Sequence, residues 1–142
     1  MIMNMRFAVA TVAAVSLAGL SGQAMAQTFT TKMNGANEKP TAADPKGTGT
    51  AKITIKDTQV CWDLQTHELP GATMAHIHKG GPDVAGGVAV ALTPPDANGH
   101  SAGCATADAA VAGDIAAHPG DYYVNVHTAT FKAGAIRGQL GK

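Results

Sequence analysis

The chain consists largely of short segments in which apolar and polar residues alternate, and this alternation constrains the fold more than any other feature. Residues 50–56 show it best, because Ala51, Ile53 and Ile55 are separated by lysine and threonine. A period of two places the apolar side chains on one face of a β-strand and the polar ones on the other. The chain also contains 17 glycine and 7 proline residues, which favour turns between strands. The pattern therefore predicts a β domain.

Eight segments have the composition and pattern of strands: residues 29–33, 50–56, 59–65, 73–78, 87–92, a short stretch around Cys104, 122–128 and 135–140. One helix is expected over residues 108–117, since Asp108 can cap its N-terminus and Pro119-Gly120 ends it. Seven or eight short strands with one short helix indicate an all-β fold. We expect an antiparallel Greek-key, immunoglobulin-like β-sandwich.

The first 26 residues have the organisation of an export signal. Residues 1–6 contain a positive charge, residues 7–20 are apolar but too short to span a bilayer comfortably, and Ala24-Met25-Ala26 matches the pattern cleaved by signal peptidase. We therefore expect a signal peptide over residues 1–26 and one domain over residues 27–142. The protein would be periplasmic or secreted, without membrane insertion.

The charge of the chain excludes some classes of partner. Ten basic and ten acidic residues give a formal net charge of 0, so there is no electrostatic reason to expect nucleic acid as a partner. The sequence also contains no Gly-x-Ser-x-Gly turn, no phosphate-binding loop and no pair of carboxylates at a recognisable catalytic spacing. A binding function is therefore favoured over catalysis.

Two cysteines, Cys61 and Cys104, lie in the part of the chain expected to be exported. An even number of cysteines in an oxidising compartment predicts one disulfide. Two thiolate metal ligands are the alternative, but neither cysteine has a second cysteine or a histidine at ligand spacing.

Three histidines are candidate metal ligands. His76 and His78 are two residues apart in one predicted strand and therefore lie on the same face. His127 lies in another alternating strand, residues 122–128. If these two strands are neighbours, three imidazoles can converge on a transition-metal ion. Structural histidines that bond to loop backbone, and histidines that act as acid or base, are the alternatives.

Copper is the expected ion, because imidazole suits it, the affinity series of divalent metals favours it, and no carboxylate accompanies the motif. Zinc, iron or manganese are alternatives. Near the ligands, Tyr123 and Asn125 are candidates for supporting hydrogen bonds. Arg137 is a candidate either for bonds to backbone carbonyls or a carboxylate, or for binding an anion. A homodimer that shares ligands across its interface is compatible with the sequence.

Several strings, in order, resemble the CHRD domain, a module named for its repeats in chordin and found as a single exported bacterial domain. They are Val60-Cys61-Trp62, Ala75-His76-Ile77-His78 with Lys79-Gly80-Gly81, residues 87–92, Gly103-Cys104, residues 119–128 and residues 134–140. The resemblance implies an all-β domain. It implies little about activity, which depends on the site.

A looser resemblance is to copper–zinc superoxide dismutase, a Greek-key β-sandwich that binds copper through a His-x-His strand and a further histidine. Its arginine near the C-terminus helps to attract the anion. His76-Ile77-His78, His127 and Arg137 are similar to that set in chain order. The bridging histidine and the zinc ligands of that enzyme have no counterpart here, and Cys61 precedes the His-x-His motif.

Three functions are compatible with these observations. The first is an exported metal-binding protein for copper handling or for redox chemistry at the metal. The second is a metal-free adhesion or protein-interaction module, in which the histidines brace the loop after residue 78. The third is an enzyme similar to superoxide dismutase, in which Arg137 guides the anion.

Overall fold

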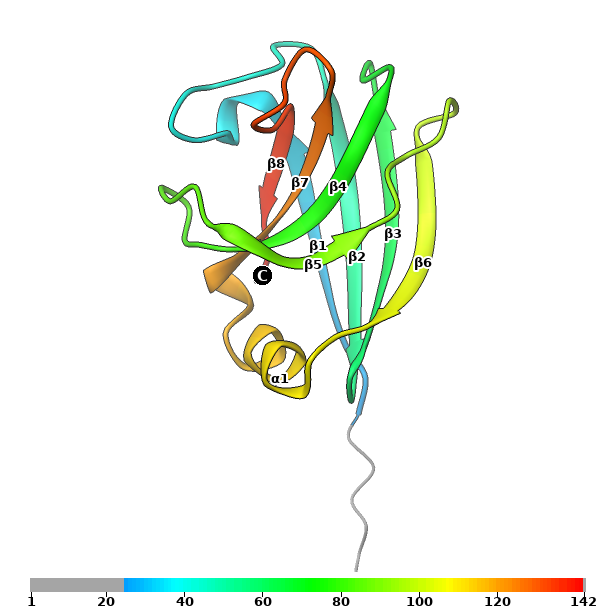
Figure 1. Cartoon of the computed structure of the whole chain (residues 1–142), viewed down its shortest axis with the longest axis vertical. Helices are drawn as coiled ribbons and strands as arrows, with labels where there is room; N and C mark the ends of the chain where they lie inside the picture. The colour runs from blue at the N-terminus through cyan, green and yellow to red at the C-terminus, as the bar shows by residue number, and fades with distance from the viewer. Residues whose placement is uncertain (1–24, 142) are drawn as a thin grey trace, which may run out of the picture.

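The computed structural model describes residues 25–141, which form eight strands, one α-helix and two 3-10 turns (Figure 1). The strands are β1 (Gln27–Asn34), β2 (Thr48–Lys56), β3 (Gln59–His67), β4 (Ala72–Lys79), β5 (Gly87–Leu92), β6 (His100–Thr106), β7 (Tyr122–Thr128) and β8 (Ile136–Gln139). The helix is α1 (Ala109–Ala117), and the turns are η1 (Gly35–Asn37) and η2 (Pro119–Asp121). The predicted signal peptide lies almost entirely outside the described residues.

All eight strands belong to one hydrogen-bonded sheet, in the order β5-β4-β7-β8-β1-β2-β3-β6. Every neighbouring pair is antiparallel. The sheet curls until β5 and β6, its two outer strands, come near each other, so that the fold is nearly a barrel (Figure 1). The predicted all-β antiparallel fold with one short helix is confirmed. A division of these strands into two sandwiched sheets is not confirmed.

The predicted strands are all present. Several are two or three residues longer than expected, whereas β8 is two residues shorter than the predicted segment 135–140. β1 and β2 pair along their whole length, from Gln27 opposite Ile55 to Asn34 opposite Thr48. Backbone pairing therefore extends each strand into polar residues that show little alternation. β5 and β7 have the predicted bounds.

The inside of the curled sheet is the core. Apolar residues at alternate positions of neighbouring strands are fully buried there, among them Ile53, Leu64, Ile77, Val124 and Ile136. This is the packing that the alternating sequence predicts, because one face of each strand must be removed from water.

Helix α1 lies across one end of the sheet, the lower end in Figure 1. Its Ala112 and Ile115 are buried, and the Asp108 side chain caps its N-terminus by accepting a hydrogen bond from the Ala110 amide at 2.8 Å. Asp114 binds Lys79 of β4 at 2.7 Å and also accepts a hydrogen bond from the Tyr122 hydroxyl. The helix therefore joins the strands that contain the histidine motifs.

Cys61 and Cys104 are directly opposite each other in β3 and β6, with their sulfur atoms 2.09 Å apart. The predicted pairing of the two cysteines is supported by this proximity. The bond ties the outer strand β6 to the rest of the sheet.

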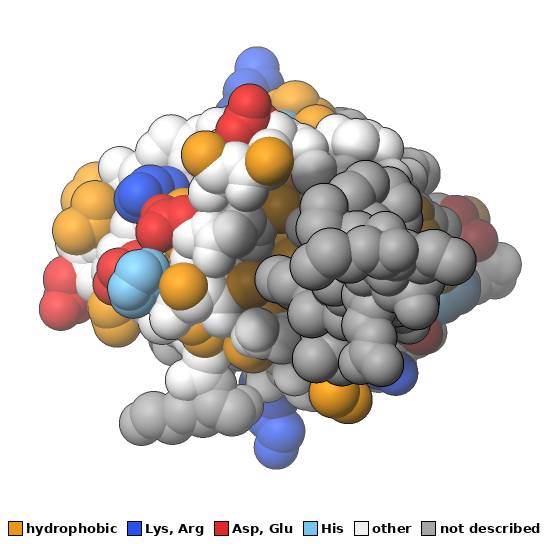
Figure 2. All heavy atoms as spheres, turned by 90° about the horizontal axis from the view of Figure 1, so that it is seen from below, with side chains coloured by type: hydrophobic (Ala, Val, Ile, Leu, Met, Phe, Trp, Pro, Cys, Tyr) orange, Lys and Arg blue, Asp and Glu red, His pale blue; other side chains and the backbone are white. Residues whose placement is uncertain are grey.

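The described surface shows no segregation of charge on the face seen in Figure 2, where acidic and basic side chains lie among apolar ones. Among residues 25–141, no helix is both long and apolar enough to cross a membrane.

Candidate metal centre

Strands β4 and β7 are neighbours, and their pairing brings the two histidine motifs together. His76 lies opposite Asn125, and His78 lies opposite Tyr123. Ala75 and Ile77 of β4 face the core and are fully buried. The intervening histidines therefore lie on the outer face of the sheet, where His127 joins them from β7.

The three imidazoles form one cluster. His76 Nδ1 lies 3.0 Å from His127 Nε2, and the rings of His76 and His78 are in edge contact with centroids 5.3 Å apart. One candidate ligand atom from each of the three residues lies within 4.8 Å of the others. Nitrogen ligands around one tetrahedral ion lie about 3.3 Å apart, given bonds of about 2.0 Å. Small side-chain rotations therefore suffice to bring all three onto one ion.

Hydrogen bonds from the Nδ1 atoms orient two of the rings. His78 Nδ1 donates to the Gly86 carbonyl at 3.0 Å, and His127 Nδ1 donates to the Lys132 carbonyl at 2.9 Å. A carbonyl can only accept, so each Nδ1 holds the proton and each Nε2 of the neutral ring has a free lone pair. Metal-binding histidines have this arrangement, in which a backbone carbonyl fixes the tautomer.

The Nε2 atoms of His127 and His78 differ in their hydrogen-bond partners. His127 Nε2 accepts a hydrogen bond from His76 Nδ1 at 3.0 Å. His78 Nε2 is buried and has no hydrogen-bond partner among the described residues. A buried polar atom without a partner is costly and calls for an explanation. A metal ion held by the three rings would give this atom a partner and would replace the His76–His127 hydrogen bond.

All three histidines are held in the neutral form that can bind metal. Burial, together with the neighbouring His127 and His78, lowers the pKa of His76 to about 4. Burial also lowers the pKa of His78, against the effect of its bond to Gly86, and that of His127. The cluster therefore needs no deprotonation to bind a metal near pH 7.

Tyr123 and Arg137 form a stack behind His78. The Tyr123 ring lies parallel to the His78 ring, 4.9 Å between centroids, and the Arg137 guanidinium lies 3.4 Å from the Tyr123 ring centroid. Arg137 is 2% exposed and donates to the Val84 carbonyl at 2.8 Å and the Gly81 carbonyl at 2.7 Å. Its side chain therefore bonds to the backbone of the β4–β5 loop and does not extend into solvent as an anion clamp would.

Asn125 connects the cluster to a buried carboxylate that the sequence did not reveal. Its Nδ2 donates to Glu38 Oε1, and its Oδ1 is buried without a partner among the described residues. Glu38 is itself buried, and burial raises its pKa to about 7 despite the opposing effect of Arg137. A glutamate in a loop rich in glycine, proline and lysine ordinarily faces solvent, so no local signal marked Glu38.

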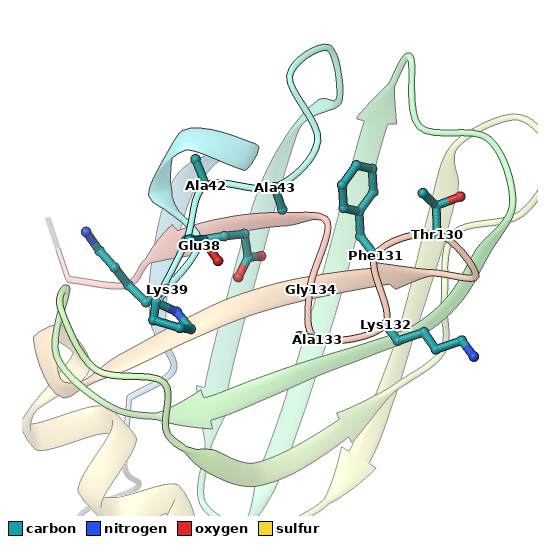
Figure 3. A pocket seen from close by; sticks show the side chains of 11 residues that line it. Glu38, Lys39, Ala42, Ala43, Thr130, Phe131, Lys132, Ala133 and Gly134 are labelled. Carbon is teal, nitrogen blue, oxygen red and sulfur yellow. The ribbon is translucent and has the colours of Figure 1, made fainter.

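Glu38 lines a cavity of about 230 Å³ between the loop that precedes β2 and the loop that precedes β8. Figure 3 shows its carboxylate directed toward the second loop, with the ends of Lys39 and Lys132 directed outward. Gly134 in that loop has φ +142, and a Cβ there would lie 2.4 Å from Asn125 Nδ2. Only glycine allows the loop to pass so close to the Glu38–Asn125 pair.

The other histidines lie away from the cluster. His100 contacts Asp63 at 3.2 Å, His118 contacts Asp114 at 3.1 Å, and His67 is exposed at the end of β3. The structure thus brings together His76, His78 and His127, with Tyr123, Asn125 and Arg137 beside them.

Comparison with known proteins identifies the family of the chain. The family model described as CHRD domain matches residues 29–140, nearly all of the described residues. No curated protein and no solved structure matches the chain. The resemblance noted from the strand motifs is therefore confirmed, and the chain belongs to the CHRD domain family.

Proposed function

We propose that this protein binds one transition-metal ion, with copper preferred, through His76, His78 and His127. The observation that supports this most directly is the buried Nε2 of His78, which has no hydrogen-bond partner within residues 25–141 and belongs to a neutral ring fixed by the Gly86 carbonyl. Two further imidazoles lie on the same outer face of β4 and β7. A metal is the partner that satisfies this atom and uses all three rings.

A purely structural role, in which the three histidines only brace loops, explains only part of their arrangement. It explains the Nδ1 bonds to Gly86 and Lys132, but it leaves His78 Nε2 buried at a cost of about 1–3 kcal/mol. It also provides no reason for three imidazoles to share one face, where their protonated forms would repel one another.

Copper suits the ligands best. Imidazole binds copper, zinc, nickel and iron, and the affinity series places copper highest among the divalent ions. Bound copper would supply one-electron redox chemistry, while the protein fixes the ligands and limits access to the ion. We propose metal handling, such as storage or delivery, in the periplasm or outside the cell as the role of the site.

The test measures metal binding by purified protein lacking residues 1–26. Copper(II) or zinc(II) is added, unbound ion is removed, and the bound metal is counted. We expect about one equivalent in the wild type and a loss of at least tenfold in affinity in the double variant His76→Ala/His78→Ala.

A matched control is the double variant His100→Ala/His118→Ala, which removes two exposed histidines remote from the cluster. It should bind metal like the wild type, and circular dichroism should show that both double variants are folded. Equal metal binding by the two double variants would refute the proposed ligands.

The finer description of the fold is also a proposal. The β3–β4 and β6–β7 connections join strands that are not neighbours in the sheet, as Greek-key connections do. We therefore propose that the curled sheet is a flattened Greek-key sandwich.

A further inference from the structure

The Met74 side chain is exposed beside the histidine cluster. Met74 is 45% exposed and belongs to β4, two residues before His76. It is paired across the strands with His127. The outer face around it also contains His76, His78, Asn125 and Tyr123, which can form hydrogen bonds, and the apolar Val88 and Ala91 of β5, which are paired with His78 and His76. Of these apolar residues, Met74 alone carries a donor atom that can bind a metal.

We propose that the Met74 thioether is a fourth, soft ligand of the histidine cluster and makes it a site for monovalent copper. This inference rests on the proposed function, because it requires that the three histidines bind metal. The inference specifies the oxidation state of the bound copper ion and identifies Met74 as the residue that selects it.

The strand register supports this assignment. Residues directly opposite in an antiparallel pair have Cβ atoms about 4.5–5.5 Å apart, and residues two apart in one strand share a face. Met74 therefore adjoins His127 across the strands and His76 along its own strand. Its three rotatable side-chain bonds allow the sulfur to reach an ion held by those residues.

Burial indicates which side of the cluster remains open. His78 and His127 are buried, whereas His76, the neighbour of Met74 on β4, is only partly buried. The accessible side of the three imidazoles is therefore at His76, which adjoins Met74 along β4 and Ala91 across the strands. A fourth ligand from this chain would be expected at that side.

The chemistry of the donors favours copper(I). Thioethers are soft ligands that select copper(I), whereas carboxylate and water oxygens suit harder ions. The buried carboxylate nearest the cluster, Glu38, accepts a hydrogen bond from Asn125. Three imidazoles and one thioether would therefore bind copper(I) in preference to zinc(II).

The experiment compares the wild type, Met74→Leu and Met33→Leu. Met33 is the other methionine after residue 26 and is buried in the core, so its replacement removes a thioether remote from the cluster. Copper(I) is supplied without oxygen, with ascorbate to leave the disulfide intact, and its affinity is measured against a chromogenic chelator. Zinc(II) affinity is measured in parallel.

We expect Met74→Leu to weaken copper(I) binding at least tenfold and zinc(II) binding less than twofold. Met33→Leu should match the wild type for both ions. X-ray absorption of the copper(I) protein should show a sulfur neighbour that Met74→Leu removes.

Two results would overturn the inference while the histidine site stands: wild-type copper(I) affinity in Met74→Leu, or an equal loss of both ions in that variant. Failure of the wild type to bind copper(I), copper(II) or zinc(II) would instead refute the proposed function and the thioether ligand together.

Discussion

At the scale of single residues, the hydrogen bonds of each imidazole decide what its other nitrogen can do. His78 and His127 use Nδ1 to donate to backbone carbonyls of Gly86 and Lys132. Their Nε2 atoms are therefore acceptors on the side where the three rings meet. The tautomer needed for ligation is set by the fold before any ion arrives, which reduces the reorganisation needed for binding.

Glu38 is the residue whose replacement should alter the pH dependence of stability. Folding raises its pKa from 4.5 to about 7, so the folded protein holds this proton more tightly than the unfolded chain. The contribution of Glu38 to the free energy of unfolding is then fully present below pH 4.5 and is lost as pH rises through 7.

Glu38→Gln keeps an oxygen that can accept from Asn125 and removes this titration. We expect the free energy of unfolding of Glu38→Gln, relative to the wild type, to increase between pH 5 and pH 8 by on the order of 2 kcal/mol. Urea denaturation of the metal-free proteins measures it, and the shared histidine titrations cancel in the comparison. Glu68→Gln, which removes an exposed carboxyl, is the control. A difference that stays constant with pH would contradict the prediction.

At the scale of elements, part of the outer face of β4 and β7, on the side of His78, is covered by a loop that side chains hold in place. The β4–β5 loop is bound at both the Gly81 and the Val84 carbonyls by Arg137 of β8. Gly86, at the end of the same loop, orients His78. Arg137 therefore contacts the loop whose Gly86 carbonyl orients His78.

Arg137→Lys should loosen this loop. Lysine keeps the positive charge but lacks the planar fork that reaches two carbonyls and stacks on Tyr123. We expect a loss of about 2–4 kcal/mol in the free energy of unfolding and about tenfold weaker metal binding, because the orientation of His78 is less constrained.

Denaturation, metal titration and hydrogen exchange of residues 80–86 measure these effects. Lys52→Ala, which removes an exposed cation from β2, is the comparison variant. Unchanged exchange protection of residues 80–86 in Arg137→Lys would show that the guanidinium does not hold the loop.

At the scale of the whole molecule, the disulfide and the histidine cluster lie in different parts of the sheet. The disulfide joins β3 to the outer strand β6, whereas the cluster lies on β4 and β7 near the other edge. Removal of the disulfide should therefore lower the free energy of unfolding while the metal affinity of the folded protein stays the same.

Cys61→Ser/Cys104→Ser should lower the free energy of unfolding by roughly 4 kcal/mol, because the disulfide links residues 43 positions apart and so restricts the unfolded chain. At a temperature where the variant is still folded, its metal affinity should lie within twofold of the wild type. Thermal denaturation and metal titration test the two parts. A loss of metal affinity in the folded variant would show that the two regions are coupled.

Much of the secondary structure follows from the amino-acid sequence, because its signals are local. Alternation marked the strand with Ile53 and Ile55, and Asp108 with Pro119 bounded the helix. The prediction was less accurate at the ends of strands. Thr48 and His67, for example, belong to strands because they pair with each other. It did not reveal Glu38, whose burial depends on a loop nearly a hundred residues later in the chain.

The sequence by itself determined which side chains share a face: His76 with His78, and Asn125 with His127. The period of a strand is a property of each chain segment alone. Only the tertiary structure decided that β4 and β7 are neighbours, that Met74 is paired with His127, and that His78 Nε2 is buried with no partner in the described part of the chain. Strand order and burial depend on contacts between residues distant in the sequence, and the local pattern does not encode which of the possible pairings buries the core best.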